Sequence, residues 1–227
     1  MMNTRRRNLR TLADLGFRVA DNLPVRRLDE DELPELRPQA EIVGRVLALK
    51  AFWLWVDIHP NAESESTVRE MIESSQLRMQ LTQSELEIID LSRAEAFAEH
   101  GHLMGWKNEN CWPLAWVLGF PEIPSVTVGQ VSGILGRRLM LEWLPNNSVE
   151  SRQFAASCRL RASGQVHDLD DLFYCAHNAV RSAQLGEDTV PDDFDPLADG
   201  GCIHERRHSL TWMLSPGVSW DDTDLST

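Results

Sequence analysis

The sequence predicts an all-α protein, a single-domain irregular multi-helix bundle with a Trp-rich core that spans residues 1–227. In most long segments the apolar residues return at three- and four-residue spacing, as on one face of a helix. Residues typical of helix starts and stops flank these segments. Eight tryptophans stand against one tyrosine, so indole rings supply much of the expected core volume. A chain of 227 residues is long enough to bury a substantial core.

The first part of the chain predicts two helices joined by a connector. Residues 4–15 have helical spacing, and Gly16 stands where a helix stop is expected. Residues 17–38 hold three prolines and a run of acidic residues, which is typical of a connector. Residues 39–58 are apolar around most of the helix circumference, which predicts a central, buried helix.

The middle of the chain predicts shorter helices. One is expected over 64–75, and Thr82 with Glu85 forms a capping-box pattern that opens another helix. Residues 106–119 also have helical spacing but contain Pro113. Because proline removes a backbone donor and clashes with the preceding turn, we expect a kink or a helix that starts near Pro113.

The last part of the chain alternates helices and loops. Residues 124–144 fit a short helix better than a strand, and 168–185 form a clearly amphipathic helix. The acidic segment 187–200 does not follow the residue order of a calcium-binding EF-hand loop and is interpreted as a solvated loop. A final helix is expected over 202–214, before a C-terminal tail at 216–227.

The charge balance limits the kinds of partner. A net charge of −13 repels nucleic acid and anionic membrane surfaces and attracts a basic protein partner. Near the N-terminus the chain carries a basic cluster, interpreted as the solvated face of the first helix: Arg5, Arg6, Arg7 and Arg10. We therefore expect no nucleic-acid and no membrane partner. The oligomeric state has no signal in the sequence.

The cysteines and the apolar segments predict a cytoplasmic protein. The four cysteines, Cys111, Cys158, Cys175 and Cys202, are widely spaced and lack zinc-finger intervals, so we interpret them as reduced, buried thiols. No apolar stretch approaches the ~20 residues that cross a bilayer. The arginine-rich start leads into acidic residues and not into the apolar segment of a signal peptide.

The sharpest polar signal is a set of ionisable side chains in apolar helices: Glu41, Arg45, Glu109, Glu205 and Arg206. The four-residue spacing of Glu41 and Arg45 predicts an ion pair between them. The whole set can converge as a sealed network that fixes helix register, or it can line a ligand cleft with Trp106, Trp116 and Trp212. We favour the sealed network.

One segment matches a metal-dependent hydrolase pattern. His204, Glu205 and His208 satisfy H-E-x-x-H, in which two histidines bind zinc and the glutamate activates water. Two arginines between the histidines place positive charge beside the ion, and neither His nor Glu follows His208 to supply a third ligand. Other catalytic templates are missing from the sequence, so we assign no catalytic residue and no cofactor.

The chain also resembles a bacterial family, domain of unknown function 4272, over nearly its whole length. The similarity lies in short motifs in a fixed order: Arg5-x-x-x-Leu9, Glu41-x-x-x-Arg45, Leu81-Thr82-x-x-Glu85, Trp106-x-x-Glu109, Leu114-x-Trp116-x-Leu118-Gly119, Glu205-Arg206-x-x-x-Leu210-x-Trp212 and Trp220-Asp221-Asp222. The chain departs from the family pattern at Pro113 and His204. The resemblance implies that Glu205 and Arg206 belong to the family pattern and that the zinc-like flank is incidental. It implies no activity.

These observations favour a non-enzymatic cytoplasmic module that binds a protein or regulates one. The acidic charge and the acidic loop motivate a basic partner, and one concrete version is an immunity-type protein that neutralises a basic toxin. The alternative is a metal-dependent hydrolase that uses the 204–208 segment.

Overall fold

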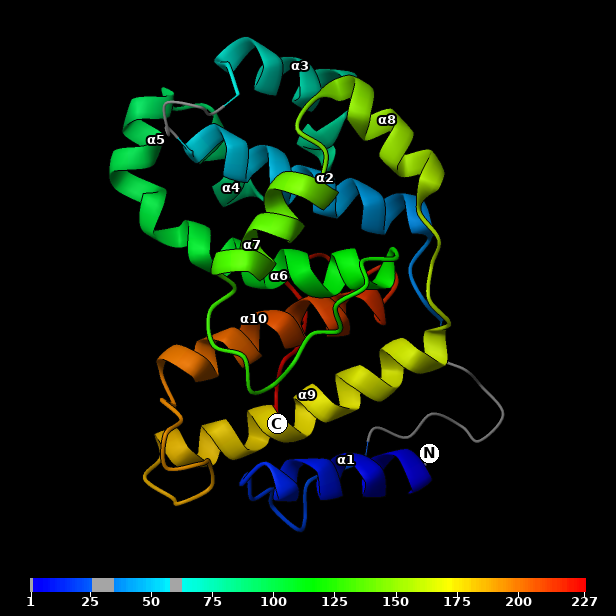
Figure 1. Cartoon of the computed structure of the whole chain (residues 1–227), viewed down its shortest axis with the longest axis vertical. Helices are drawn as coiled ribbons and strands as arrows, with labels where there is room; N and C mark the ends of the chain where they lie inside the picture. Colours follow the sequence, from blue (N-terminus) through cyan, green and yellow to red (C-terminus); the bar gives the residue numbers. More distant parts are fainter. Residues whose placement is uncertain (1, 26–34, 58–62) are drawn as a thin grey trace. The chain divides into compact units, whose positions relative to one another are not determined.

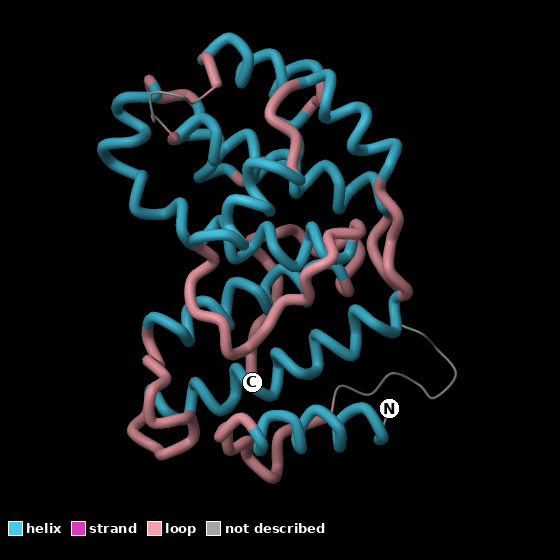
Figure 2. Tube along the Cα trace, in the orientation of Figure 1, coloured by secondary structure: helices cyan, strands magenta, loops and turns pink. Residues whose placement is uncertain are grey.

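A computed structural model describes residues 2–25, 35–57 and 63–227, and throughout these ranges the chain forms helices and loops without a strand (Figure 2). The all-α prediction is therefore confirmed. None of the helices in these ranges is both long and apolar enough to span a bilayer. The chain forms two compact units that interleave in sequence. Unit 1 holds residues 1–36, 124–130 and 161–227, and unit 2 holds 37–123 and 131–160. The single-domain organisation stays a prediction.

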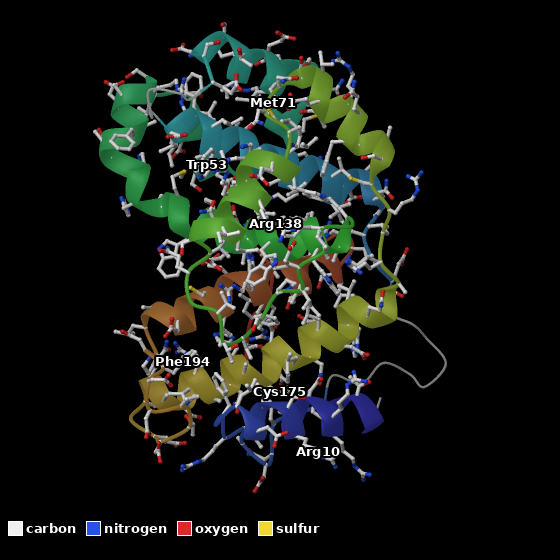
Figure 3. All side chains as sticks on the ribbon, viewed as in Figure 1. Arg10, Trp53, Met71, Arg138, Cys175 and Phe194 are labelled. Atoms are coloured by element: carbon white, nitrogen blue, oxygen red, sulfur yellow. The ribbon has the colours of Figure 1, made fainter. Side chains whose placement is uncertain are left out.

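Unit 1 is built around a long helix that contacts two others (Figure 1). Its helices are α1 (Met2–Asp14), α9 (Ser163–Gln184) and α10 (Ala198–Met213). Helix α1 ends before Gly16, whose φ of 87° lies in the left-handed region that favours glycine. This confirms the first helix and its stop. Arg10, labelled in Figure 3, is exposed on α1, as expected for a solvated arginine.

Buried polar bonds attach both neighbours to α9. On the α1 side, the carboxylate of Asp171 accepts hydrogen bonds from Arg5 at 2.8 Å and Asn8 at 2.9 Å. On the α10 side, the Thr211 hydroxyl donates to Asp170 at 2.7 Å. Arg5, which was predicted to lie on the solvated face of the first helix, is instead buried, and Asp171 supplies its counter-charge.

Unit 2 is built around α2, which contacts most of the other helices of this unit (Figure 1). Its elements are α2 (Gln39–Val56), α3 (Glu65–Ser74), η1 (Leu77–Gln80), α4 (Gln83–Ile89), α5 (Arg93–His100), η2 (Gly101–Leu103), α6 (Met104–Val117), α7 (Gly133–Arg137), the π-helix η3 (Arg138–Trp143) and α8 (Ser148–Ser157). Thirteen of the 18 residues of α2 are buried, which confirms the central helix that its apolar circumference predicted. Met71 on α3, labelled in Figure 3, is also fully buried.

Capping residues define several helix starts in unit 2. Both bonds of the predicted capping box of Thr82 and Glu85 are present at α4. Ser92 and Glu95 form a second box at α5, a helix that we did not predict. Helix α8 was also missed, and the Asn147 side chain caps it.

Helix α6 differs from the prediction for residues 106–119. It begins at Met104 and runs through Pro113 to Val117, so a start near Pro113 is wrong. Proline removes only the N–H that would bind the carbonyl of Glu109, and the apolar burial of the surrounding residues maintains the rest of the helix. In the region 124–144 the favoured short helix is confirmed as α7, and the π-helix after it was not foreseen.

The predicted acidic loop is shorter than expected. Helix α10 starts at Ala198, because the Asp195 carboxylate accepts hydrogen bonds from the backbone of Leu197 and Ala198 at 2.8 and 3.0 Å. Residues 187–197 thus form the loop. The connector 17–38 contains no helix where it is described, and its residues 26–34 lie outside the described ranges. The tail at 216–227 is also free of helix.

The tryptophans are divided between buried and half-buried positions. Four are buried, Trp55, Trp112, Trp116 and Trp212, and the other four are half-buried. Most buried hydrophobic residues are aliphatic. The Trp-rich core stays a prediction.

Candidate functional site: two buried polar centres

The first polar centre lies in unit 2 and consists of Arg45 on α2, Glu85 on α4 and Lys107 on α6. We name it the carboxylate centre. The Arg45 guanidinium donates two parallel hydrogen bonds to Glu85, at 2.7 and 2.9 Å, and a third to the carbonyl of Gln80 at 2.8 Å. The Lys107 ammonium lies 2.7 Å from the same carboxylate. Two cations on different helices thus hold one anion.

The two cations decide the charge state of Glu85. Burial alone would raise the pKa of this carboxyl, but the charge and the hydrogen bonds of Arg45, followed by those of Lys107, lower it to about 2. Glu85 is therefore a carboxylate throughout the neutral range. A carboxylate with such a low pKa is a poor base near pH 7, and its hydrogen bonds join helices α2, α4 and α6.

A cavity of about 370 Å³ opens on the carboxylate centre. Glu85 and Lys107 line it together with apolar residues from the same unit: Phe52, Ile88, Leu91 and Leu103. The volume is in the range of small-molecule sites, which are largely apolar with a few polar groups.

The ion pair predicted between Glu41 and Arg45 is replaced by two others. Glu41 pairs with Arg37, one turn earlier, at 2.9 Å, and about half of its side chain is exposed. Arg45 pairs with Glu85 from a different helix. The predicted pair was wrong because the four-residue spacing within one helix cannot reveal a buried acid, here Glu85, on a neighbouring helix.

Glu109, the third predicted network residue in unit 2, is completely buried. Its carboxylate accepts a hydrogen bond of 2.5 Å from the backbone N–H of Val131. Val131 stands two residues before the start of α7. Glu109 therefore ties helix α6 to the irregular segment that leads into α7.

The second polar centre lies in unit 1, where two neighbouring arginines of α10 hold irregular backbone. We name these residues, Arg206 and Arg207, the arginine clamps. Arg206 is fully buried and donates hydrogen bonds of 2.6 to 2.7 Å to the carbonyls of Ser125, Val128 and Gly129. Arg206 is thus a buried residue, whereas its membership of one network with the other predicted residues stays a prediction. Glu205, next to it, is half-buried.

Arg207 joins the C-terminal tail to α9. It donates to the carbonyls of Leu225 and Ser226 at 2.8 and 3.1 Å, and to Nδ1 of His177 at 2.5 Å. Because a guanidinium can only donate, Nδ1 of His177 must be the acceptor and its proton must be on Nε2. Burial, then the charge of Arg207, lowers the pKa of His177 to about 3, with smaller effects from His204 and Arg181. His177 is therefore neutral at pH 7.

The two histidines of the H-E-x-x-H segment contact other protein groups in the structure. Nε2 of His208 lies 2.9 Å from the carbonyl oxygen of Trp220, and its ring packs edge-on against that indole. A carbonyl only accepts, so Nε2 carries a proton and offers no lone pair to a metal. His204 is exposed, with Nδ1 at 3.5 Å from Nε2 of His177. Within 2–25, 35–57 and 63–227, no three His, Cys, Asp or Glu side chains are grouped to hold a metal ion.

All four cysteines are buried and form no disulfide, in agreement with the sequence prediction. Burial raises the pKa of Cys111 and of Cys175 to about 12 and that of Cys158 to about 11. Cys175 lies on α9 (Figure 3). Since the thiolate is the nucleophile, thiols with such pKa values are unreactive at neutral pH.

The predicted cleft residues are distributed over both units. Trp106 and Trp116 lie on α6 of unit 2 and Trp212 on α10 of unit 1, and only Trp106 is more than slightly exposed. Likewise, Glu41, Arg45 and Glu109 belong to unit 2, and Glu205 and Arg206 to unit 1. One network or cleft made by all of them stays a prediction.

Sequence reasoning missed four residues of the two centres: Glu85, Lys107, His177 and Arg207. Glu85 was noticed as a capping residue but not as the partner of Arg45. The sequence could have pointed to Lys107, because it is one of only two lysines in the chain. His177 and Arg207 lie 30 residues apart, and no local spacing could join them.

A comparison with known protein families supports the resemblance that the ordered motifs indicated. The chain matches a family described as a domain of unknown function, DUF4272, over residues 4–223. It belongs to the DUF4272 family. The match confirms the resemblance drawn from the motifs and covers both polar centres of this DUF4272 protein. No curated protein and no solved structure is significantly similar to the chain.

Proposed function

We propose that this DUF4272 protein is a non-enzymatic cytoplasmic binding module whose partner is a basic protein. The observation that carries the proposal is the uneven distribution of charge. Residues 161–227 hold 13 acidic and four basic residues, a balance of −9 out of −13 for the whole chain. A surface of one sign attracts a partner of the opposite sign and speeds its association.

The acidic side chains of this stretch are largely exposed. Those of the loop and of the tail are Glu187, Asp188, Asp192, Asp193, Asp195, Asp221, Asp222 and Asp224. Some have structural roles, since Asp188 pairs with Arg18, and Asp195 accepts hydrogen bonds from the backbone at the start of α10. Asp192 and Asp193 are the best candidates for partner contact, because both are exposed in the middle of the loop.

The two polar centres support a binding function over a catalytic one. Glu85 is held as a weak base, His177 is held as a neutral imidazole, and the buried arginines bind carboxylate or backbone oxygens. These groups position helices and loops. The hydrolase alternative is less well supported, because Nε2 of His208 is used by Trp220. An immunity-type protein against a basic toxin is one concrete form of the proposal.

The test is capture of a partner followed by measurement with the identified protein. Cross-linking in source cells and mass spectrometry identify candidates, and binding to each purified candidate is measured at low and high salt. We expect a partner with a high isoelectric point whose affinity falls steeply with salt. The double substitution Asp192→Asn/Asp193→Asn should weaken binding several-fold.

A matched control removes the same charge elsewhere. Glu73→Gln/Glu99→Gln changes two exposed carboxylates of unit 2 and should leave the affinity nearly unchanged. A partner without net positive charge, an affinity indifferent to salt, or equal loss in both double variants would overturn the proposal. So would the capture of no protein in either salt condition.

A further inference from the structure

We propose that the cavity of unit 2 binds a small molecule with an apolar body and a carboxylate head, and that Lys107 binds the head. This ligand site is separate from the acidic loop of unit 1 and independent of the protein partner proposed above. The argument rests on the shape of the cavity, the free donors of Lys107 and the distribution of charge along its wall.

The apolar wall accepts a hydrocarbon or aromatic body. Phe52 and Ile88 are buried, and Leu91 and Leu103 are half-buried at the cavity. Apolar side chains that face a cavity of about 370 Å³ favour removal of an apolar ligand from water.

Lys107 supplies the polar end of the site. An ammonium group has three hydrogen-bond donors. Across the part of the chain that the structure describes, Glu85 is its one hydrogen-bond partner, so two donors are available. About a fifth of the Lys107 side chain is exposed, and its Nζ lies 5.5 Å from the centre of the Phe52 ring. The cation thus stands beside the apolar wall and not in bulk water.

The charges around Lys107 favour an anion at this end of the cavity. Arg45 and Lys107 together exceed Glu85 by one positive charge, and both carboxylate oxygens of Glu85 are already occupied by Arg45. Glu85 therefore has little capacity to bind a cationic ligand. A carboxylate ligand can share the ammonium with Glu85 by charge-assisted hydrogen bonds.

Glu87 is the opposing charge at the cavity. It is exposed, lines the cavity, and accepts a hydrogen bond from Gln83 at 3.1 Å. Its negative charge repels a carboxylate ligand. His100, which is half-buried, also lines the cavity and supplies a further hydrogen-bonding group. Loss of the charge of Lys107 should therefore weaken binding of a carboxylate ligand, whereas loss of the charge of Glu87 should strengthen it.

Calorimetric titration with a matched pair of probes, octanoate and octanamide, tests the proposal. The two have the same apolar chain and differ in the charge of the head. We expect octanoate to bind the intact protein about tenfold more tightly than octanamide. Lys107→Met should abolish this preference, Lys107→Arg should keep it, and Glu87→Gln should strengthen octanoate binding several-fold without changing octanamide binding.

Two further variants control for structure. Leu91→Trp fills the cavity while it leaves the charges in place, so it should weaken both probes. Arg78→Met removes an exposed cation of unit 2 that does not line the cavity, and it should change neither. If Lys107→Met fails to fold, the Glu87→Gln and Leu91→Trp results decide. Equal affinity of the intact protein for the two probes, or no binding of either, would overturn the proposal.

Discussion

The two polar centres use the same kind of cation for different structural tasks. In the carboxylate centre of unit 2, Arg45 and Lys107 meet a side-chain anion, and the contact joins three helices, α2, α4 and α6. In unit 1 the arginine clamps meet backbone carbonyls of segments that have no helix. The difference teaches that a buried ion pair fixes helices against one another, whereas a buried guanidinium can satisfy the carbonyls of irregular backbone.

The largest loss of stability is expected when a buried cation of the carboxylate centre is removed. We expect Arg45→Met to lower the free energy of unfolding by about 4 kcal/mol, because it leaves Glu85 buried with only Lys107 as a counter-charge. Urea denaturation monitored by tryptophan fluorescence measures the change. The control Arg137→Met breaks an exposed pair with Glu142 and should cost less than about 1 kcal/mol.

A double variant tests whether Arg45 and Glu85 stabilise the fold as an ion pair. Arg45→Met/Glu85→Leu removes both charges, so its loss of stability should be smaller than that of Arg45→Met alone. Losses that simply add in the double variant would show that the two groups do not stabilise the fold as a pair.

At the arginine clamps the effect should be smaller and local. Arg206→Met leaves three carbonyls without their guanidinium donors, and we expect a loss of about 3 kcal/mol. Hydrogen exchange should show the backbone near Ser125 to Gly129 opening before the rest of unit 1. Uniform acceleration of exchange over the whole unit would instead indicate that Arg206 stabilises the core as Arg45 does.

Acidification should distinguish the centres by their pH ranges. His177 has a pKa lowered to about 3, so between pH 6.5 and 3 the unfolded chain binds a proton that the folded chain does not, and stability falls as the pH falls. Between pH 7 and 5 this amounts to about 2 kcal/mol. Glu85, with a pKa lowered to about 2, loses its stabilising effect only below its unfolded pKa near 4.5.

The variant His177→Gln tests this difference, because it removes the titrating group and keeps a hydrogen-bond acceptor near Arg207. Denaturation at pH 7, 6 and 5 should give a smaller slope of stability against pH in the variant than in the original protein. An unchanged slope would assign the acid sensitivity of this range to other groups.

Local patterns in the sequence were sufficient for the helices but not for the contacts between them. The apolar circumference of residues 39–58 predicts a buried α2, and the capping box predicts the start of α4. The spacing of Glu41 and Arg45 predicted the wrong pair, because the partner of Arg45 is 40 residues away on another helix. The periodicity of a sequence identifies the buried face of one helix but does not show which other helix that face contacts.

The same limit applies to the candidate site. Arg206 was recognised as a buried residue from its apolar neighbours, but its partners are three backbone carbonyls, and backbone groups leave no signal in the sequence. The zinc-like pattern at His204 and His208 had the right helical spacing. The hydrogen bond of His208 to the carbonyl of Trp220 could not be foreseen from this spacing.

The smallest effect is expected at Lys50, a cation of unit 2 that is bound in the manner of the unit 1 clamps. Its ammonium is fully buried, donates to the carbonyl of Met140 in the π-helix at 2.5 Å, and lies 4.6 Å from the centre of the Trp53 ring, which Figure 3 labels on α2. Burial lowers the pKa of Lys50 to about 8, although nearby acidic groups partly oppose it. The folded state therefore holds this charge at a cost.

Replacement of Lys50 by an uncharged side chain of similar length tests whether the desolvation cost of the ammonium exceeds the stability gained from its hydrogen bond to Met140. We expect Lys50→Met to raise the free energy of unfolding at pH 7 by about 1 kcal/mol, since desolvation of the ammonium outweighs one hydrogen bond to a carbonyl. In the original protein, stability should rise between pH 8 and 10.5, where the unfolded chain binds the proton that the folded chain releases, and the variant should lack this rise. A loss of more than about 2 kcal/mol in the variant at pH 7 would mean that a cation bound to a carbonyl stabilises unit 2 as strongly as it does unit 1, and the contrast between the two regions would fail.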